Sequence, residues 1–163
     1  MSIVGEVMNA MIAFDGNDIK RINHFLKVYG YAKALGESEK LDESTQTILE
    51  ILALTHDIGI RNSEKKYSSS EAKYQHIEGP PEAEKLLKEL GVQQTIIDRV
   101  CWVIGRHHDY NNIEGLDYQI LVEADFLVNA YEKKLSSESI QQFGENVFLT
   151  RSGKNLLKNM YRI

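Results

Sequence analysis

The stretch Ile51-Leu52-Ala53-Leu54-Thr55-His56-Asp57 ends an apolar helical pattern on a histidine and an aspartate. The pattern begins near Asp42 or Ser44, whose side chains suit a helix N-cap. A carboxylate is costly at an apolar helix end unless a cation, a hydrogen-bond network or water compensates its desolvation. The sequence therefore indicates a metal ion as one possible partner of His56 and Asp57.

The same 3.6-residue apolar period extends over almost the whole chain, and no segment shows a clean period of two. We therefore expect an all-α fold, a single-domain helical bundle over residues 1–163. Its motif-bearing core is expected at about 18–135, with the N-terminal helix and the C-terminal tail as packing elements. The predicted helices are Ile3 to Phe14, Asp18 to Leu35 with Gly36 as C′ residue, Asp42 or Ser44 to Asp57, Gln94 to His107, Asp117 to Leu135, and short ones around Ile140 to Phe148 and Leu156 to Tyr161.

Two stretches between Asp57 and Gln94 contain residues typical of loops and helix starts. The polar stretch Gly59 to Glu71 predicts a loop that is long for a compact helical domain, and such loops are often functional lids. Gly79-Pro80-Pro81 predicts the start of a helix that Gly91 ends. His76 is then expected just before that start.

All five histidines lie inside predicted helices, near helix ends or beside an aspartate, and Asp125 interrupts the apolar run from Leu121 to Val128. Neighbouring helical residues point about 100° apart, so His56 and Asp57 share one ion only at the helix end, or if Asp57 bridges two ions. Imidazole and carboxylate suit Fe, Mn, Zn, Co or Ni, and a single cysteine excludes a thiolate site. The candidate metal ligands, for one or two divalent ions, are His24, His56, Asp57, His76, His107, His108 and Asp125.

The composition favours a small ligand over a polymer. The formal charge of −5 lacks the basic excess that binding along a nucleic-acid backbone requires. No apolar run approaches the roughly 18 residues of a membrane span, and the N-terminus lacks a signal-peptide pattern. We expect a cytoplasmic protein without a membrane or nucleic-acid partner; the oligomeric state is left open.

The order His24, then His56-Asp57, then Asp125 resembles the H…HD…D signature of the HD superfamily of metal-dependent phosphohydrolases. His76 and His107 resemble the extra histidines of its two-metal members, and the equivalent of His108 binds metal only in some. The resemblance implies a helical bundle in which His24, His56, Asp57 and Asp125 hold one ion. It implies that Asp57, His76 and His107 hold a second.

That resemblance also implies hydrolysis of a nucleotide-like or other small phosphate ester by metal-activated water, with Asp57 holding the ions and able to accept a proton. Arg61 and Arg106 are the cations that we expect to bind phosphate, ahead of Lys65 and Lys66. Phosphohydrolase branches often carry a lysine shortly after the HD pair, where this chain has Arg61 one position later. No Gly-Tyr-Pro tripeptide follows His108, and Lys20 stands one turn before His24, so cyclic di-GMP is not the expected substrate.

Two other functions fit the same residues. A smaller branch of the family, which resembles inositol oxygenase, uses four histidines and two aspartates in a diiron site that activates dioxygen. A third possibility is a metal-binding regulatory module without turnover. Iron content and oxygen uptake would identify the oxygenase, and a lack of turnover with any phosphate ester would identify the module.

Overall fold

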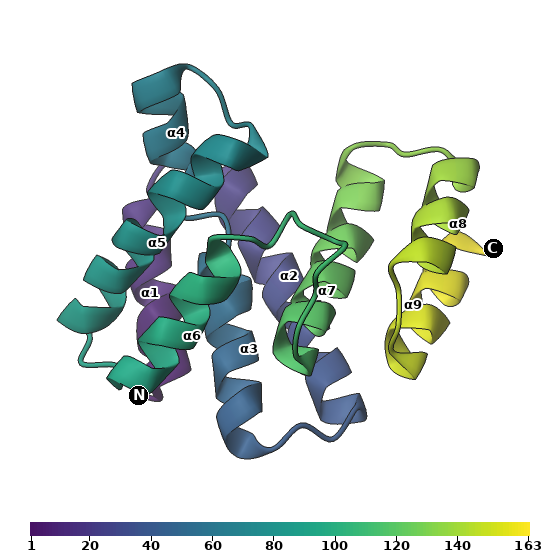
Figure 1. The fold of residues 1–163 in the computed structure, drawn as a ribbon, viewed down its shortest axis with the longest axis horizontal. Coiled ribbons are helices and arrows are strands. Elements are labelled where there is room, and N and C mark those ends of the chain that lie inside the picture. Colours follow the sequence, from purple (N-terminus) through teal and green to yellow (C-terminus); the bar gives the residue numbers. More distant parts are fainter.

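Nine helices make up the computed structural model, which describes residues 1–163 (Figure 1). The all-α prediction is confirmed. The helices are α1 (Ile3–Phe14), α2 (Ile19–Ser38), α3 (Glu43–Thr55), α4 (Ile60–Tyr67), α5 (Ala72–Glu89), α6 (Gln94–Ile104), α7 (Leu116–Glu132), α8 (Ser137–Asn146) and α9 (Arg151–Tyr161).

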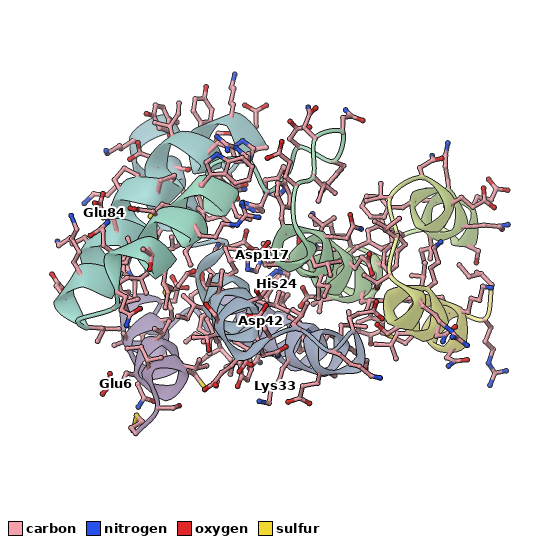
Figure 2. All side chains as sticks on the ribbon, turned by 60° about the horizontal axis from the view of Figure 1, so that its bottom comes forward. Glu6, His24, Lys33, Asp42, Glu84 and Asp117 are labelled. Atoms are coloured by element: carbon pink, nitrogen blue, oxygen red, sulfur yellow. The ribbon has the colours of Figure 1, made fainter.

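The centre of the bundle is formed by α2, α3 and α7, which pack against one another (Figure 1). Every residue of α7 from Asp117 to Val128 is buried, and α3 is buried without interruption from Leu49 to Thr55. A helix that is buried all round must lie inside the molecule, because it has no face suited to water. The polar residues of these two helices are therefore forced into the interior, and His24 of α2 lies among them at the middle of the molecule (Figure 2).

The outer helices cover this centre on two sides. On one side, α5 packs against both α4 and α6, and α6 also contacts α3. The C-terminal pair α8 and α9 lies beside α7 (Figure 1). No helix combines the length and the apolar character that a membrane crossing requires.

The helix starts that were expected from capping residues are present. Asp18 Oδ1 accepts a hydrogen bond from the backbone N–H of Arg21 at 3.0 Å, and Asp42 Oδ1 accepts one from Thr45 at 2.9 Å. Both satisfy a backbone donor that the first helical turn leaves free. Gly91 ends the α5 region with φ +73°, in the left-handed conformation that favours glycine.

The role predicted for Gly36 was wrong. The helix continues through it to Ser38, and Gly36 is buried between α2 and α3. A Cβ at this position would lie 2.3 Å from Oε1 of Gln46 and 2.9 Å from a methyl carbon of Leu49. Glycine is present because two helices approach closely, a reason that the sequence alone does not distinguish from a cap.

The long loop predicted from Gly59 to Glu71 was also wrong, because Ile60–Tyr67 form α4. Ser63 is buried, and its hydroxyl donates to the carbonyl oxygen of Gly59 at 2.8 Å. The helix packs against α5 and ends at Ser68, whose φ is 53°. Arg61, Glu64, Lys65 and Lys66 are good helix formers, and packing against α5 adds to their propensity.

The helix α5 begins at Ala72, seven residues before the predicted start, so Pro80 and Pro81 lie inside it. Proline removes a backbone donor and is normally excluded from a helix interior. Here Gly79 lies against Gly59 and Ile104, and burial of this close contact offsets the missing hydrogen bonds. His76 consequently lies within the helix rather than before it. The other predicted boundaries differ less: α6 ends at Ile104, before His107.

Candidate metal centre

Four of the predicted ligands converge from three helices on one point in the bundle. His24 comes from α2, His56 and Asp57 from the end of α3, and Asp125 from α7. Their ligand atoms all lie within 4.8 Å of one another. His24 Nε2 lies 3.1 Å from Asp125 Oδ1, and His56 Nε2 lies 3.2 Å from the same oxygen.

Asp57 is placed between this group and the remaining histidines. Its Oδ2 atom lies 3.3 Å from His24 Nε2 and 3.2 Å from His56 Nε2. Its other oxygen, Oδ1, lies 3.6 Å from Nε2 of His107. One carboxylate therefore faces two separate groups of imidazoles.

The opposite ring nitrogen of each of these histidines has an acceptor of its own. Nδ1 of His56 donates to the carbonyl oxygen of Ala53 at 2.9 Å, and Nδ1 of His107 donates to that of Ile104 at 2.9 Å. Nδ1 of His24 lies 2.6 Å from Glu132 Oε1. A proton on Nδ1 leaves the lone pair of the neutral imidazole on Nε2, which is the form that binds metal.

In this tautomer the Nε2 lone pairs face carboxylate oxygens. His107 Nε2 is buried without any hydrogen-bond partner. A buried acceptor facing other acceptors is unfavourable unless a cation lies among them. Ligands of an ion bound at about 2.1 Å are roughly 3.0–3.4 Å apart. The spacings around Asp57 and Asp125 match that, so the residues fit a bound divalent ion.

The close contacts between imidazoles and carboxylates shift the pKa values of this group. Burial opposes the charged form of His24, but its hydrogen bonds with Asp125 and Asp57 outweigh burial and raise its pKa to about 9. Burial likewise opposes the charged form of His56, and the charge of Asp57 nevertheless raises its pKa well above the usual value. Burial raises the pKa of Asp125, but hydrogen bonds from His24 and His56 lower it overall. Protons thus bind where a metal ion would replace them.

A second group, His76, His107 and His108, lies on the other side of Asp57, with ligand atoms within 4.8 Å of one another. Burial and the neighbouring His107 lower the pKa of His108 to about 3, and the same two causes lower the pKa of His76. Both rings are therefore neutral near pH 7. Neutral imidazoles at this spacing are suited to bind a metal ion.

The hydrogen bonds of Gln75 determine the tautomer of His108. The amide Nε2 of Gln75 donates to the carbonyl oxygen of Ser70 at 2.6 Å, so its Oε1 faces His108 Nε2, 3.2 Å away, as an acceptor. His108 must then carry its proton on Nε2, and its lone pair is on Nδ1. This ring consequently differs from His56 and His107, in which Nε2 is the free atom.

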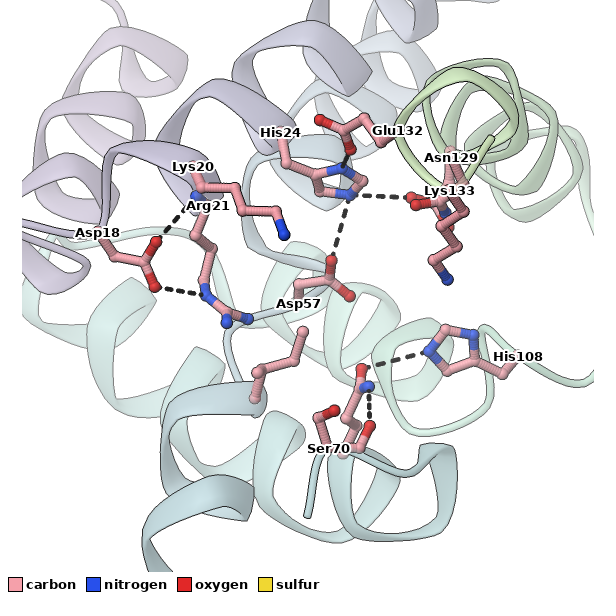
Figure 3. Close-up of a pocket in the computed structure, with 13 residues that line it drawn as sticks. Asp18, Lys20, Arg21, His24, Asp57, Ser70, His108, Asn129, Glu132 and Lys133 are labelled. Atoms are coloured by element: carbon pink, nitrogen blue, oxygen red, sulfur yellow. Dashed lines mark hydrogen bonds and ion pairs between the residues drawn. The ribbon is translucent and has the colours of Figure 1, made fainter. Parts of the chain in front are cut away.

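A polar cleft of about 360 Å³ opens onto His24, Asp57 and Asp125 of the first group and onto His108 (Figure 3). Only Ile60 among its lining residues is hydrophobic. The residues are Asp18, Lys20, Arg21, His24, Asp57, Ile60, Ser70, Gln75, His108, Asp125, Asn129, Glu132 and Lys133.

The two arginines that the sequence favoured as phosphate ligands are not brought to this cleft. Arg61 is exposed and donates to the carbonyl oxygen of Phe14, with its guanidinium also over the Phe14 ring. Arg106 lies over the ring of Trp102, 3.6 Å from its centroid. Nearness in sequence to the motif residues did not place these cations at the site. Lys66 pairs with Glu78 at 2.6 Å, outside the cleft.

Three other cations line the cleft and were not selected from the sequence. Lys20 and Arg21 lie four and three residues before His24, so all three share one face of α2. That spacing could have identified them. Lys133 follows the last residue of α7, eight positions after Asp125, and no local signal distinguishes it from Lys134.

The family model of the HD domain matches residues 21–141, the region that contains every candidate ligand. The chain belongs to the HD-domain family. The matched residues include His56-Asp57, and Asp57 lies between the two groups of candidate ligands.

The structure of this HD-domain protein is similar to a solved one, a predicted HD superfamily hydrolase from an uncultured Thermotogales bacterium. The TM-score is 0.68 at 22% sequence identity, over 96% of this chain and 84% of the other. The likeness shows that the fold is shared. No match was found among curated proteins.

Proposed function

We propose that this HD-domain protein is a metal-dependent phosphohydrolase that acts on a nucleotide or another small phosphate ester. The observation that carries the proposal is the position of Asp57, whose two oxygens face different groups of histidines. A carboxylate in this position is suited to bridge two ions, as in two-metal sites that clamp the attacking and leaving oxygens of a phosphoryl group. The polar cleft with three cations beside it suits an anionic substrate.

The ligand sets follow from the two groups. His24, His56, Asp57 and Asp125 would hold the first ion, and Asp57, His76 and His107 the second, with His108 adding Nδ1 to the second. The mixture of imidazole and carboxylate fits Fe, Mn, Zn, Co or Ni. Bound metal would lower the pKa of a coordinated water and stabilise charge on the phosphoryl oxygens.

The side chains around the ions would accept a proton, hold the ligand rings in place and bind the phosphate. Asp57 and Asp125 would both lie beside the reacting centre. Asp57, whose oxygens face both groups of histidines, is the candidate proton acceptor. Glu132 and the carbonyl of Ala53 hold the rings of His24 and His56 in place through Nδ1. Arg21, beside Asp18 in the cleft, supplies a planar guanidinium that suits phosphate oxygens.

The test begins with elemental analysis of gently purified protein, before and after incubation with Mn²⁺, Fe²⁺, Ni²⁺ or Zn²⁺. Two equivalents per chain are expected, with a sharp loss in His56→Ala and Asp125→Asn. Asp98→Asn is the matched control, because Asp98 is an exposed aspartate of α6 that belongs to neither ligand group and does not line the cleft. Absence of metal in the wild type under every condition would overturn the proposal.

Turnover is then measured with p-nitrophenyl phosphate and bis(p-nitrophenyl) phosphate, which distinguish a phosphomonoesterase from a phosphodiesterase. Hydrolysis that follows the metal content across the variants supports the proposal. Iron as the native metal together with oxygen consumption and no phosphate release would instead support the oxygenase.

A further inference from the structure

Two lysines enter the cleft from opposite sides without an acidic partner. Lys20 extends from α2 and Lys133 from the end of α7, on either side of Asp57 (Figure 3). The third cation, Arg21, is already paired, with Asp18 at 3.2 Å and Glu64 at 3.4 Å. Lys27, six residues further along α2, is paired with Glu132 at 2.7 Å. Lys20 and Lys133 are thus the two lysines of the cleft that no acidic side chain pairs.

The charge balance of the cleft indicates how many negative charges that ligand carries. Two divalent ions would offset the four lining carboxylates, those of Asp18, Asp57, Asp125 and Glu132. The basic side chains of Lys20, Arg21 and Lys133 then leave a formal excess of positive charge in the cleft. One phosphate monoester brings about 1.5 to 2 negative charges at neutral pH, so a second anionic group is needed to match it.

The lining also restricts the rest of the ligand. Ile60 is its only apolar residue, and its only aromatic rings are the imidazoles of His24 and His108, both candidate metal ligands, with no Phe, Tyr or Trp among the lining. Proteins that bind nucleobases generally stack them on aromatic side chains or hold them between apolar ones. A ligand that fits this cleft is therefore compact and polar apart from its phosphates.

We propose that the substrate carries two phosphoryl groups on a compact polar molecule, with one group at the metal ions and the second held between Lys20 and Lys133. This inference rests on the proposed phosphohydrolase function and narrows its substrate class. Lysine suits the second site because its ammonium is a point charge with three donors, which can follow a phosphate that is not held in a fixed plane.

The experiment compares two non-hydrolysable probes, methylphosphonate and methylenediphosphonate, by calorimetry on the Mn²⁺-loaded full chain at fixed ionic strength. The variants are Lys20→Met and Lys133→Met. Lys134→Met is the matched control, because Lys134 is the adjacent lysine and lies outside the cleft. Elemental analysis of each variant establishes that its metal content equals that of the wild type.

Methylenediphosphonate should bind the wild type more tightly than methylphosphonate. A diphosphonate also binds metal ions through both groups, so the variants decide the matter. Each lysine variant should weaken diphosphonate binding about tenfold, leave methylphosphonate binding within about twofold, and Lys134→Met should change neither. Equal losses for both probes, or none for either, would overturn the inference while phosphonate binding at the metal ions still supports the proposed function. A wild type that binds metal but neither probe would overturn both the inference and the proposed function. If ADP bound much more tightly than methylenediphosphonate, only the inference about a compact substrate would be overturned.

Discussion

Oε1 of Glu132 lies 2.6 Å from Nδ1 of His24, and the other oxygen of the same carboxylate lies 2.7 Å from Nζ of Lys27. Glu132 is the last residue of α7, seven residues or about two helical turns beyond Asp125, and it orients the His24 ring, which comes from α2. A carboxylate behind a ligand histidine fixes its tautomer and increases its basicity.

Glu132→Gln is therefore expected to weaken binding of the first metal ion by about 10- to 100-fold, as losses of such outer partners do. Competition with a fluorescent chelator measures the change. Glu84→Gln is the control, since Glu84 pairs only with Lys88 on the surface of α5. An unchanged metal affinity in Glu132→Gln would show that His24 is oriented by packing alone.

The metal-free protein should lose stability as pH rises from about 6.5 to about 9. Burial opposes the charged form of His24, yet its bonds with Asp125 and Asp57 raise its pKa from 6.5 to about 9. A raised pKa contributes stability that is complete below the unfolded value and disappears as pH passes the folded one. Thermal unfolding in excess chelator, followed by circular dichroism, measures this slope.

His24→Asn should reduce that slope, and added Mn²⁺ should stabilise the wild type increasingly over the same pH range, because deprotonated rings bind the ion. A melting temperature that stays level from pH 6.5 to 9 without metal would contradict the assignment. His108 affects the pH dependence of stability only below about pH 6.5, because burial and His107 lower its pKa from 6.5 to about 3.

Gly59→Ala is expected to destabilise the fold by about 1–3 kcal/mol, the usual cost of overpacking. A Cβ there would lie 2.6 Å from the backbone nitrogen of Gly79 and 2.8 Å from the carbonyl oxygen of Gln75, and backbone atoms cannot turn aside. Urea unfolding measures the loss. Gly30→Ala is the matched control with the opposite sign, because nothing lies within 4 Å of a Cβ at Gly30 in α2.

In Gly30→Ala a gain of about 0.5–1 kcal/mol is expected, since alanine is the better helix former. Metal affinity should fall in Gly59→Ala as well, because Gly59 follows Asp57 by two residues and contacts the helix that carries His76. If Gly59→Ala had the same free energy of unfolding as Gly30→Ala, the close contact between Gly59 and Gly79 would not contribute to the stability of the fold.

Glu123 attaches the C-terminal helices to α7. It is fully buried and accepts hydrogen bonds from the backbone N–H groups of Leu149 at 2.9 Å and Thr150 at 3.1 Å, as well as from the Thr150 hydroxyl. Glu123→Ala leaves these donors without a partner and should cost about 2–4 kcal/mol in urea unfolding. Limited proteolysis should then cut between α8 and α9.

The exposed Glu145 provides the comparison, and Glu145→Ala should change stability by less than about 0.5 kcal/mol. Metal content should stay the same in Glu123→Ala, because Glu123 contacts none of the candidate ligands. Loss of metal in this variant would mean that the tail supports the site directly.

Much of the fold could be predicted because its signals are local. The apolar period predicted the helices, and Asp18 and Asp42 predicted where two of them begin, since a cap acts on backbone donors within three residues. The candidate ligands could be selected for a similar reason: Asp125 within an apolar run is costly wherever the helix lies, so the sequence alone raised the question of its partner.

Tertiary structure decided what depends on neighbours far along the chain. Gly36 packs against α3 instead of ending α2, and Pro80 and Pro81 lie inside a helix because Gly79 meets Gly59 and Ile104. These contacts join residues that the local sequence cannot bring together. A helix boundary is therefore set by packing wherever packing energy exceeds local propensity.

The cations show the same division. Arg61 and Arg106 stand close to the motif in sequence, yet one donates to Phe14 and the other lies over Trp102. Lys133, far from the HD pair in sequence, enters the cleft instead. Residue type and helical spacing fixed which groups could bind metal, whereas the packing of α2, α3 and α7 decided which charges face it, because charge acts through space and not along the chain.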